Sequence, residues 1–251
     1  MDKKQISAER KQMIVKSNDI IQKSRYKLST QQQKLILYMV SKIRPDDKEF
    51  KEYIFDLRDL CQILNIDINS ANYNRFRESM QKIADSSFWI RNNGADKLYR
   101  WIDDIDIIPN DTIVKIKFDK DLKPFLLQLK ESFTVYQLEN VLCFTCRYSF
   151  ILYELLHSYG FIGEFEISVE ELKSKLMIEN KYDRFVIFRT KVLDKAIEEI
   201  NKYTDLKVAY SFIKSKRSVI GIKFEMYSSY ISEKINQENR NNRLSNDKKE
   251  F

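Results

Sequence analysis

Residues 182–200, YDRFVIFRTKVLDKAIEEI, and the stretch 206–226 that follows, LKVAYSFIKSKRSVIGIKFEM, decide the fold. In the first stretch apolar side chains recur every three or four residues, at Phe185, Phe188, Val192, Ala196 and Ile200. This spacing predicts a helix with one face packed against its own domain. The second stretch predicts two strands, 206–213 and 218–226, on either side of a basic turn.

The same pattern occurs earlier in the chain, because four landmarks of the second half match four of the first half in the same order. The matched segments are 36–38 with 151–153, 60–66 with 172–178, 76–77 with 188–189, and 116–118 with 222–224. Any one matched triplet can arise by chance, whereas four collinear matches indicate duplication of a unit of about a hundred residues. We therefore expect the two halves to share one fold.

Each half predicts the element order helix, strand, helix, helix, strand, strand. In the first half the elements are predicted over residues 30–43, 53–57, 57–64, 73–85, 98–108 and 112–118. In the second half they are predicted over residues 147–158, 164–168, 169–176, 182–200, 206–213 and 218–226. This is the order of a winged helix, a helix-turn-helix backed by a β-hairpin. The sequence thus predicts an α+β protein with two tandem winged-helix domains related by internal duplication.

The predicted domain organisation has four parts. Residues 1–15 are expected to form a flexible N-terminal arm, residues 16–133 the first unit and residues 134–230 the second unit. The last segment, 231–251, is rich in Asn, Lys and Glu and has little to bury, so we expect a disordered tail.

Composition excludes several function classes. Only four glycines occur in 251 residues, and none lies in a GxGxxG or GxxxxGK[ST] motif, which excludes a Walker-type ATPase and the usual dinucleotide-binding fold. The single histidine, His157, cannot form the imidazole cluster of a catalytic zinc site. Cys143 and Cys146 form a lone CxxC with no second pair to complete a zinc site. We expect no metal, no cofactor and no enzymatic activity.

The sequence also bears on compartment. No apolar run approaches the length of about 18 residues that a membrane span needs, and the N-terminus lacks the apolar core of a signal peptide. Three cysteines are too few for a disulfide framework and fit a reducing compartment. We expect a cytoplasmic protein with no membrane partner.

The formal net charge of +7 favours a nucleic-acid partner, and positive side chains gather on the last helix and hairpin of the second unit. The candidate double-stranded DNA contacts there are Lys181, Arg184, Arg189, Thr190 and Lys191 on the helix and Lys214, Lys216 and Arg217 at the hairpin tip. Arg can pair bidentately with guanine, Lys can neutralise phosphate, and a wing runs along the sugar-phosphate backbone. The alternatives are a solvated helix face and a charged edge that prevents aggregation between sheets.

The first unit has a weaker candidate set. Its equivalent helix offers Arg75, Arg77 and Lys82, while its hairpin carries Asp103, Asp104 and Asp106, which would repel phosphate. We therefore expect the second unit to be the main DNA-reading domain. The first unit is expected to contact DNA less closely and to mediate dimerisation through strands near residues 98–118.

A further set of segments carries a family resemblance. They are RYS at 147–149, LYELL at 152–156, VLDKAIEEIN at 192–201, VKSN at 15–18, and LS at 28–29 with QKL at 33–35. Together, over about residues 14–228, they resemble the initiator Rep proteins of theta-replicating, iteron-containing plasmids. The resemblance implies a tandem winged-helix protein that binds repeated sequences, called iterons, at a plasmid origin.

The resemblance also implies what such a protein does at the origin. Members of this family open the duplex and recruit host helicase and primase components. Many form dimers that repress their own promoter, in equilibrium with monomers that initiate replication. The alternative is a dimeric transcriptional repressor without initiation activity, with a DNA-processing enzyme a distant third. A tandem duplication lets one monomer cover two successive grooves, whereas a repressor gains its second half-site by dimerising, and this favours the initiator.

Overall fold

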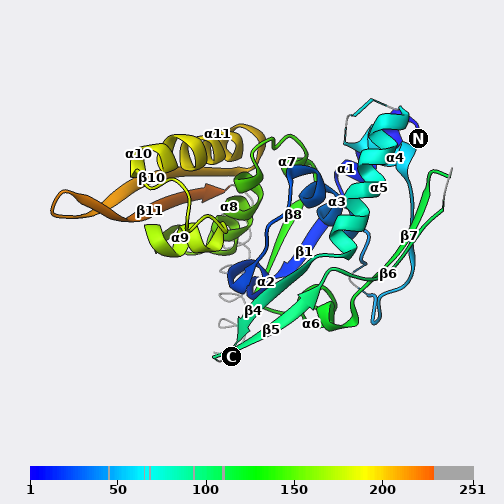
Figure 1. Ribbon diagram of the computed structural model, residues 1–251, viewed down its shortest axis with the longest axis horizontal. Coiled ribbons are helices and arrows are strands. Elements are labelled where there is room, and N and C mark those ends of the chain that lie inside the picture. Colours follow the sequence, from blue (N-terminus) through cyan, green and yellow to red (C-terminus); the bar gives the residue numbers. More distant parts are fainter. Residues whose placement is uncertain (45, 65, 68, 93, 109–110, 229–251) are drawn as a thin grey trace, which may run out of the picture.

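The computed structural model describes residues 1–228 except 45, 65, 68, 93 and 109–110 (Figure 1). The tail expected over residues 231–251 lies outside the described residues. The N-terminal segment differs from the expected flexible arm, because helix α1 (Lys3–Arg10) occupies most of residues 1–15. Asp2 and Gln5 form a capping box at its start, and Arg10 donates hydrogen bonds to the carbonyl oxygens of Gln62 and Ile63. These contacts fix the arm to the first unit.

The first winged helix consists of α3 (Thr30–Val40), β3 (Tyr53–Asp56), α4 (Leu57–Ile63), α5 (Ser70–Ala84), β6 (Ile102–Ile107) and β7 (Ile113–Phe118). Its sheet has the strand order β3-β7-β6. The helix-turn-helix is α4 and α5, and the hairpin β6–β7 is the wing. These six elements occur in the predicted order, and Phe76 on α5 is fully buried, as its spacing indicates.

A second small sheet lies between α5 and the wing, and the sequence pattern did not reveal it. It has the order β2-β4-β5, from β2 (Ser24–Arg25), β4 (Ser87–Asn92) and β5 (Ala95–Arg100). The single strand predicted over residues 98–108 is wrong, because the chain leaves β5 and begins β6 on either side of Trp101. Trp101 is buried and stacks on Phe88, with ring centroids 4.6 Å apart, so burial of one large ring marks the change from sheet to sheet.

The connection between the two winged helices contains η1 (Lys120–Leu122), α6 (Lys123–Leu126), β8 (Phe133–Gln137) and α7 (Glu139–Leu142). Strand β8 pairs antiparallel with β1 (Met13–Ser17), from Met13 opposite Gln137 to Ser17 opposite Phe133. Helix α2 (Asn18–Lys23) follows β1 directly. The expected division after residue 133 therefore falls inside a strand, and β8 completes a sheet with the N-terminal segment.

The second winged helix repeats the first. It consists of α8 (Arg147–Ser158), β9 (Glu164–Ser168), α9 (Val169–Lys175), α10 (Phe185–Phe188), η2 (Arg189–Leu193), α11 (Asp194–Tyr203), β10 (Leu206–Ser215) and β11 (Ser218–Ser228). The sheet order β10-β11-β9 has the second wing strand in the centre, as β7 is in the first sheet. This shared topology supports the duplication that the repeated landmarks indicate.

One buried ion pair joins the two halves of the molecule. Lys16 on β1 and Glu154 on α8 are 1% and 2% exposed, and the Lys16 Nζ lies 2.8 Å from both carboxylate oxygens. The hydroxyl of Tyr136 on β8 donates to the same carboxylate at 2.5 Å. Burial and the neighbouring Glu154 charge raise the pKa of Tyr136 well above its ordinary value, so this hydroxyl remains a donor. The pair thus ties the β1–β8 sheet to the first helix of the second winged helix.

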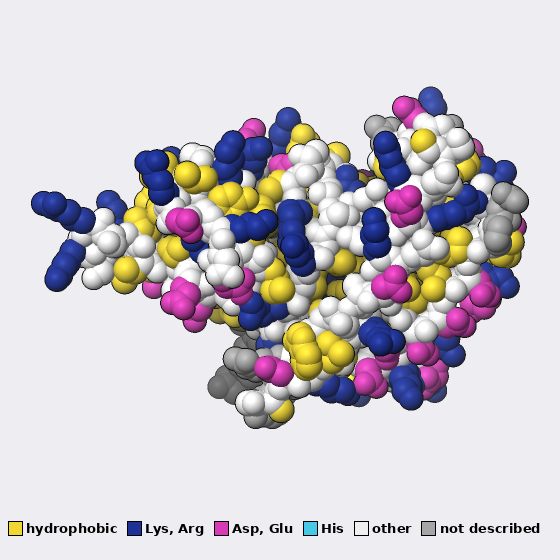
Figure 2. Space-filling view, viewed as in Figure 1, with side chains coloured by type: hydrophobic (Ala, Val, Ile, Leu, Met, Phe, Trp, Pro, Cys, Tyr) yellow, Lys and Arg dark blue, Asp and Glu magenta, His cyan; other side chains and the backbone are white. Residues whose placement is uncertain are grey.

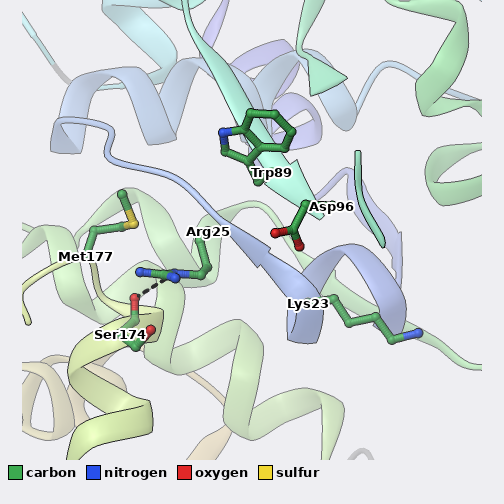
Figure 3. A pocket seen from close by; sticks show the side chains of 6 residues that line it. All are labelled: Lys23, Arg25, Trp89, Asp96, Ser174 and Met177. Atoms are coloured by element: carbon green, nitrogen blue, oxygen red, sulfur yellow. Dashed lines mark hydrogen bonds between the residues drawn. The ribbon is translucent and has the colours of Figure 1, made fainter. Parts of the chain in front are cut away.

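In a second contact between the halves, each half places a basic side chain against the C-terminal end of a helix of the other half. Lys175 at the end of α9 donates to the backbone carbonyls of Ile21 and Ser24, the latter at 2.6 Å. In return Arg25 donates to the Ser174 carbonyl at 3.1 Å (Figure 3). Arg25 also forms an ion pair with Glu179. Burial and the neighbouring charge of Lys16 lower the pKa of Lys175 to about 7, and the Glu154 carboxylate opposes part of this lowering.

Removing one member of the buried pair is expected to be costly. Lys16→Met leaves the Glu154 carboxylate buried without its cation, so we expect the free energy of unfolding to fall by about 3–5 kcal/mol. Adding Glu154→Gln to that variant is expected to recover much of the loss, because it removes the charge and keeps an acceptor for Tyr136. Urea denaturation followed by circular dichroism measures both values.

The exposed pair Lys23–Asp19 on α2, 2.7 Å long, supplies the matched control. Lys23→Met is expected to cost less than about 1 kcal/mol. A loss in Lys16→Met as small as in Lys23→Met would show that the buried pair does not hold the halves together.

Candidate nucleic-acid interface

The recognition segment of the second winged helix runs without a break through α10, η2 and α11. Its predicted packed face is confirmed, because Phe188, Val192, Ala196 and Ile200 are fully buried and Phe185 is half-buried against the core. The segment begins at Phe185, three residues later than predicted, because Tyr182 has a φ of +57° and cannot continue a helix. Lys173 on α9 donates to the Tyr182 carbonyl at 2.9 Å and fixes this turn.

The exposed side of the segment carries most of the predicted contacts. The side chains of Lys181, Arg184, Thr190 and Lys191 are exposed, and so are those of Val186 and Ile187 between them. Within the described part of the chain, Arg184 and Lys191 form no ion pair. Both cations are therefore available to a ligand. Figure 2 shows Lys and Arg side chains over α10 and α11.

Arg189 has a different environment. Its Nε lies 3.3 Å from an Asp194 carboxylate oxygen, and its guanidinium lies 5.8 Å from the centre of the Phe212 ring on β10. The same Asp194 accepts a hydrogen bond from Tyr210, also on β10. Burial and that hydrogen bond raise the pKa of Tyr210 to about 12, so the hydroxyl stays protonated. Arg189 thus braces the helix against the wing, although its side chain remains 48% exposed.

A π-helical turn, η2, covers Arg189–Leu193 in the middle of the segment. Such turns are rare and occur frequently at functional sites. Here the turn contains both Thr190 and Lys191. The Thr190 hydroxyl donates to the Val186 carbonyl at 3.0 Å, so its oxygen remains exposed with lone pairs that can accept.

The wing projects beyond the rest of the second winged helix (Figure 1). Its tip carries Lys214, Lys216 and Arg217, all exposed, and Figure 2 shows positive side chains there. Lys216 has a φ of +54°, as the tight turn requires, and a bulge lies between Ile213 and Lys214. The structure therefore places these cations together at the end of a long hairpin.

The equivalent positions of the first winged helix present fewer unpaired, exposed cations among the described residues. Arg75 and Lys82 are exposed on α5. Arg77 is half-buried and donates to Asn74 Oδ1 at 3.2 Å and to the Asp111 carbonyl beside β7, so it braces α5 against the wing. In the wing itself, Asp104 and Asp106 on β6 lie opposite Lys117 and Lys115 on β7. Their negative charge is thus partly balanced across the hairpin.

The residues considered for metal binding have ordinary structural positions. His157 is buried at the end of α8, and burial lowers its pKa. Cys143 is exposed, Cys146 precedes α8, and both are free thiols. Among the described residues no group of His, Cys, Asp and Glu is arranged to hold a metal ion. No helix of the described part of the chain is both long and apolar enough to cross a membrane.

Sequence reasoning missed three cations, two on the C-terminal part of the recognition segment and one beside it. Arg147 begins α8, and Lys195 and Lys202 lie on α11 next to it. The spacing of Lys191, Lys195 and Lys202 in the sequence indicates that they lie on one face of a helix. The position of Arg147 beside that face depends on tertiary packing and has no local signal.

The fold and the basic face define a class of protein: a tandem winged-helix protein whose second unit presents an exposed, cationic recognition helix and wing. Two family models match the chain in the same order, the initiator replication protein WH1 over residues 13–157 and the initiator Rep protein WH2 over residues 168–226. The chain belongs to the initiator replication protein family.

Individual relatives agree with this family. A replication initiation protein from Escherichia coli is 27% identical over 207 residues, covering 78% of this chain and 64% of the relative. The PI protein from Escherichia coli is 34% identical over 135 residues, which cover 47% of this chain and 44% of that protein. The chain therefore matches less than two thirds of the length of either curated relative.

Solved structures support the fold. The Pi initiator protein, crystallised in complex with iteron DNA, has a TM-score of 0.72 and 24% identity, covering 88% of this chain and 98% of that one. Domains 2 and 3 of RctB have a TM-score of 0.50 and 12% identity, covering 80% of this chain and 82% of that one. The similarity to both proteins shows that the tandem arrangement is a known architecture.

Proposed function

We propose that this protein binds repeated sequences in double-stranded DNA at a plasmid origin and initiates plasmid replication there. The observation that carries the proposal is the exposed cationic face of the second recognition segment in a chain of the initiator replication family. The similar Pi initiator was crystallised with iteron DNA. We infer a non-catalytic role in the cytoplasm, in which the protein promotes origin opening and recruits host replication proteins.

Within this function the two winged helices have different roles. The second is the main DNA-reading domain, with Lys181, Arg184, Thr190 and Lys191 facing the major groove and Arg189 at its edge. The wing cations follow the backbone. In the first unit Arg75 and Lys82 make weaker contacts with DNA. Arg77 contributes indirectly, because it fixes the position of α5.

A plasmid that carries the repeats but lacks this gene tests the function. We expect it to be maintained only in cells that receive the protein from a second replicon. A transcriptional repressor without initiation activity, the alternative, would bind the DNA and leave the plasmid unmaintained.

We also propose that the protein forms a homodimer in equilibrium with the monomer, through edge strands of the first unit. Leu98 on the edge strand β5 is 44% exposed, and it lies opposite Trp89 on the central strand β4, which is 53% exposed. Figure 3 shows Trp89 beside the pocket that contains Arg25. Sedimentation of Leu98→Lys should show weaker dimerisation, whereas Phe161→Lys, at an exposed apolar position in the second unit, should not. Equal dimerisation of Leu98→Lys and the wild type would contradict this placement.

The recognition segment is tested by separating base contacts from stability. Arg184→Ala and Lys191→Ala should each lower the preference for the repeat over random DNA, by about 1–3 kcal/mol for a bidentate contact. Both side chains are exposed, so the stability should change by less than about 0.5 kcal/mol. Phe188→Ala, in contrast, should cost about 3–5 kcal/mol of stability. Competition binding and thermal melting give these values. If both charge variants keep the preference, the reading helix is α5 instead.

A variant of the wing tests whether its cations contact the DNA backbone and not the bases. Replacing Lys214, Lys216 and Arg217 together with Ala should weaken binding to the repeat and to random DNA alike. It should also reduce the slope of log affinity against log salt by about 0.9 for each phosphate that the variant no longer neutralises. A selective loss for the repeat alone would show that the wing contacts bases.

A further inference from the structure

The turn before α8 is held between the two halves of the molecule. Glu199 on α11 accepts hydrogen bonds from the Thr145 backbone and hydroxyl at 2.8 and 2.6 Å, and from the Ser149 hydroxyl at 2.6 Å. From the other side, Gln33 on α3 donates to the Arg147 carbonyl at 2.9 Å. Arg147, the first residue of α8, is thus fixed at the boundary between α3 and α11.

An open pocket, which we call the junction pocket, lies between the start of α8 and the recognition segment. It has a volume of about 460 Å³, and its lining includes Arg147, Lys191, Lys195, Lys202, Glu198 and Glu199. Four cations therefore face two carboxylates. The cations outnumber the carboxylates by two, so the pocket has an excess of positive charge.

The Arg147 guanidinium has donors that the protein does not satisfy. Its Nε and one terminal nitrogen are buried, and neither has a hydrogen-bond partner among the described residues. The guanidinium lies 5.1 Å from the centre of the Tyr148 ring, which holds it in place. Buried donors without acceptors destabilise a fold, and a guanidinium is suited to bidentate pairing with phosphate. Arg147 also lines the junction pocket, so an anion there would lie against the accessible part of this guanidinium.

We propose that the junction pocket binds a phosphate group of a DNA strand, with Arg147 as the donor and Lys195 and Lys202 as supporting charges. This inference rests on the proposed function, because it takes duplex DNA as the source of the phosphate. DNA is favoured over another anion because Lys191 belongs both to the pocket and to the exposed side of the recognition segment. A DNA strand bound to the exposed side of the recognition segment therefore passes the pocket. The bound phosphate would set the position of the duplex at the boundary between the two units.

The test uses the full chain and a set of repeat duplexes, each with one neutral methylphosphonate. We expect the wild type to lose affinity about tenfold when one particular phosphate is neutralised, as for a hydrogen bond to a charged group. Arg147→Gln should lose about tenfold on the unmodified duplex and nothing further at that phosphate. Lys130→Gln, with an exposed lysine outside the pocket, should behave as the wild type.

Lys195→Gln provides a second variant, since its side chain is exposed and the substitution should leave the fold intact. It should lose sensitivity at the same phosphate even if Arg147→Gln proves unstable in thermal melting. The inference would be overturned if the wild type binds the repeat but neither variant changes the sensitivity to any neutralised phosphate. The proposed function would then still stand. Unchanged DNA affinity in both variants would overturn it in favour of an acidic protein segment as occupant. Failure of the wild type to bind any duplex would contradict the proposed function itself.

Discussion

A buried ion pair joins the two winged helices. Lys16 and Glu154 are far apart in the chain and almost completely buried, and they are supported by the Tyr136 hydroxyl. A buried charge pair contributes little net stability compared with apolar groups of similar size, but loss of one member is costly. Its effect is therefore to make one relative arrangement of β1, β8 and α8 much better than others. The exchange of Lys175 and Arg25 between the two halves supports the same arrangement from a second position.

The duplication explains why some basic residues that recur in both halves are structural. The repeated pair Phe76–Arg77 and Phe188–Arg189 places a buried ring beside an arginine that braces the recognition helix to its own wing. The difference between the halves lies in other positions. The second wing has three cations at its tip, whereas the first wing balances its carboxylates with lysines on the neighbouring strand. Two copies of one fold thus present surfaces of different charge.

Local sequence patterns predicted the helices and strands that have a clear apolar periodicity. The apolar spacing of residues 182–200 indicated the buried face, and the repeated landmarks indicated the two winged helices. The sheet of β1 and β8 was missed because its strands pair across more than a hundred residues, and short strands of this kind lack a distinct periodicity. Burial of Lys16 was missed for the same reason, because its partner comes from a distant helix. The exposed cations of the candidate site were predictable from helical spacing, but the bracing by Arg189 and the position of Arg147 depend on tertiary neighbours.

The central claim is that one chain with two unequal winged helices binds an array of repeated DNA sites. Footprinting the purified protein on the DNA upstream of its own gene tests this claim most directly. The account predicts several protected repeats of one sequence, in the same orientation and at a regular spacing. Protection of a single palindrome would contradict it, because that pattern is what a symmetric dimer with one recognition helix per half-site produces.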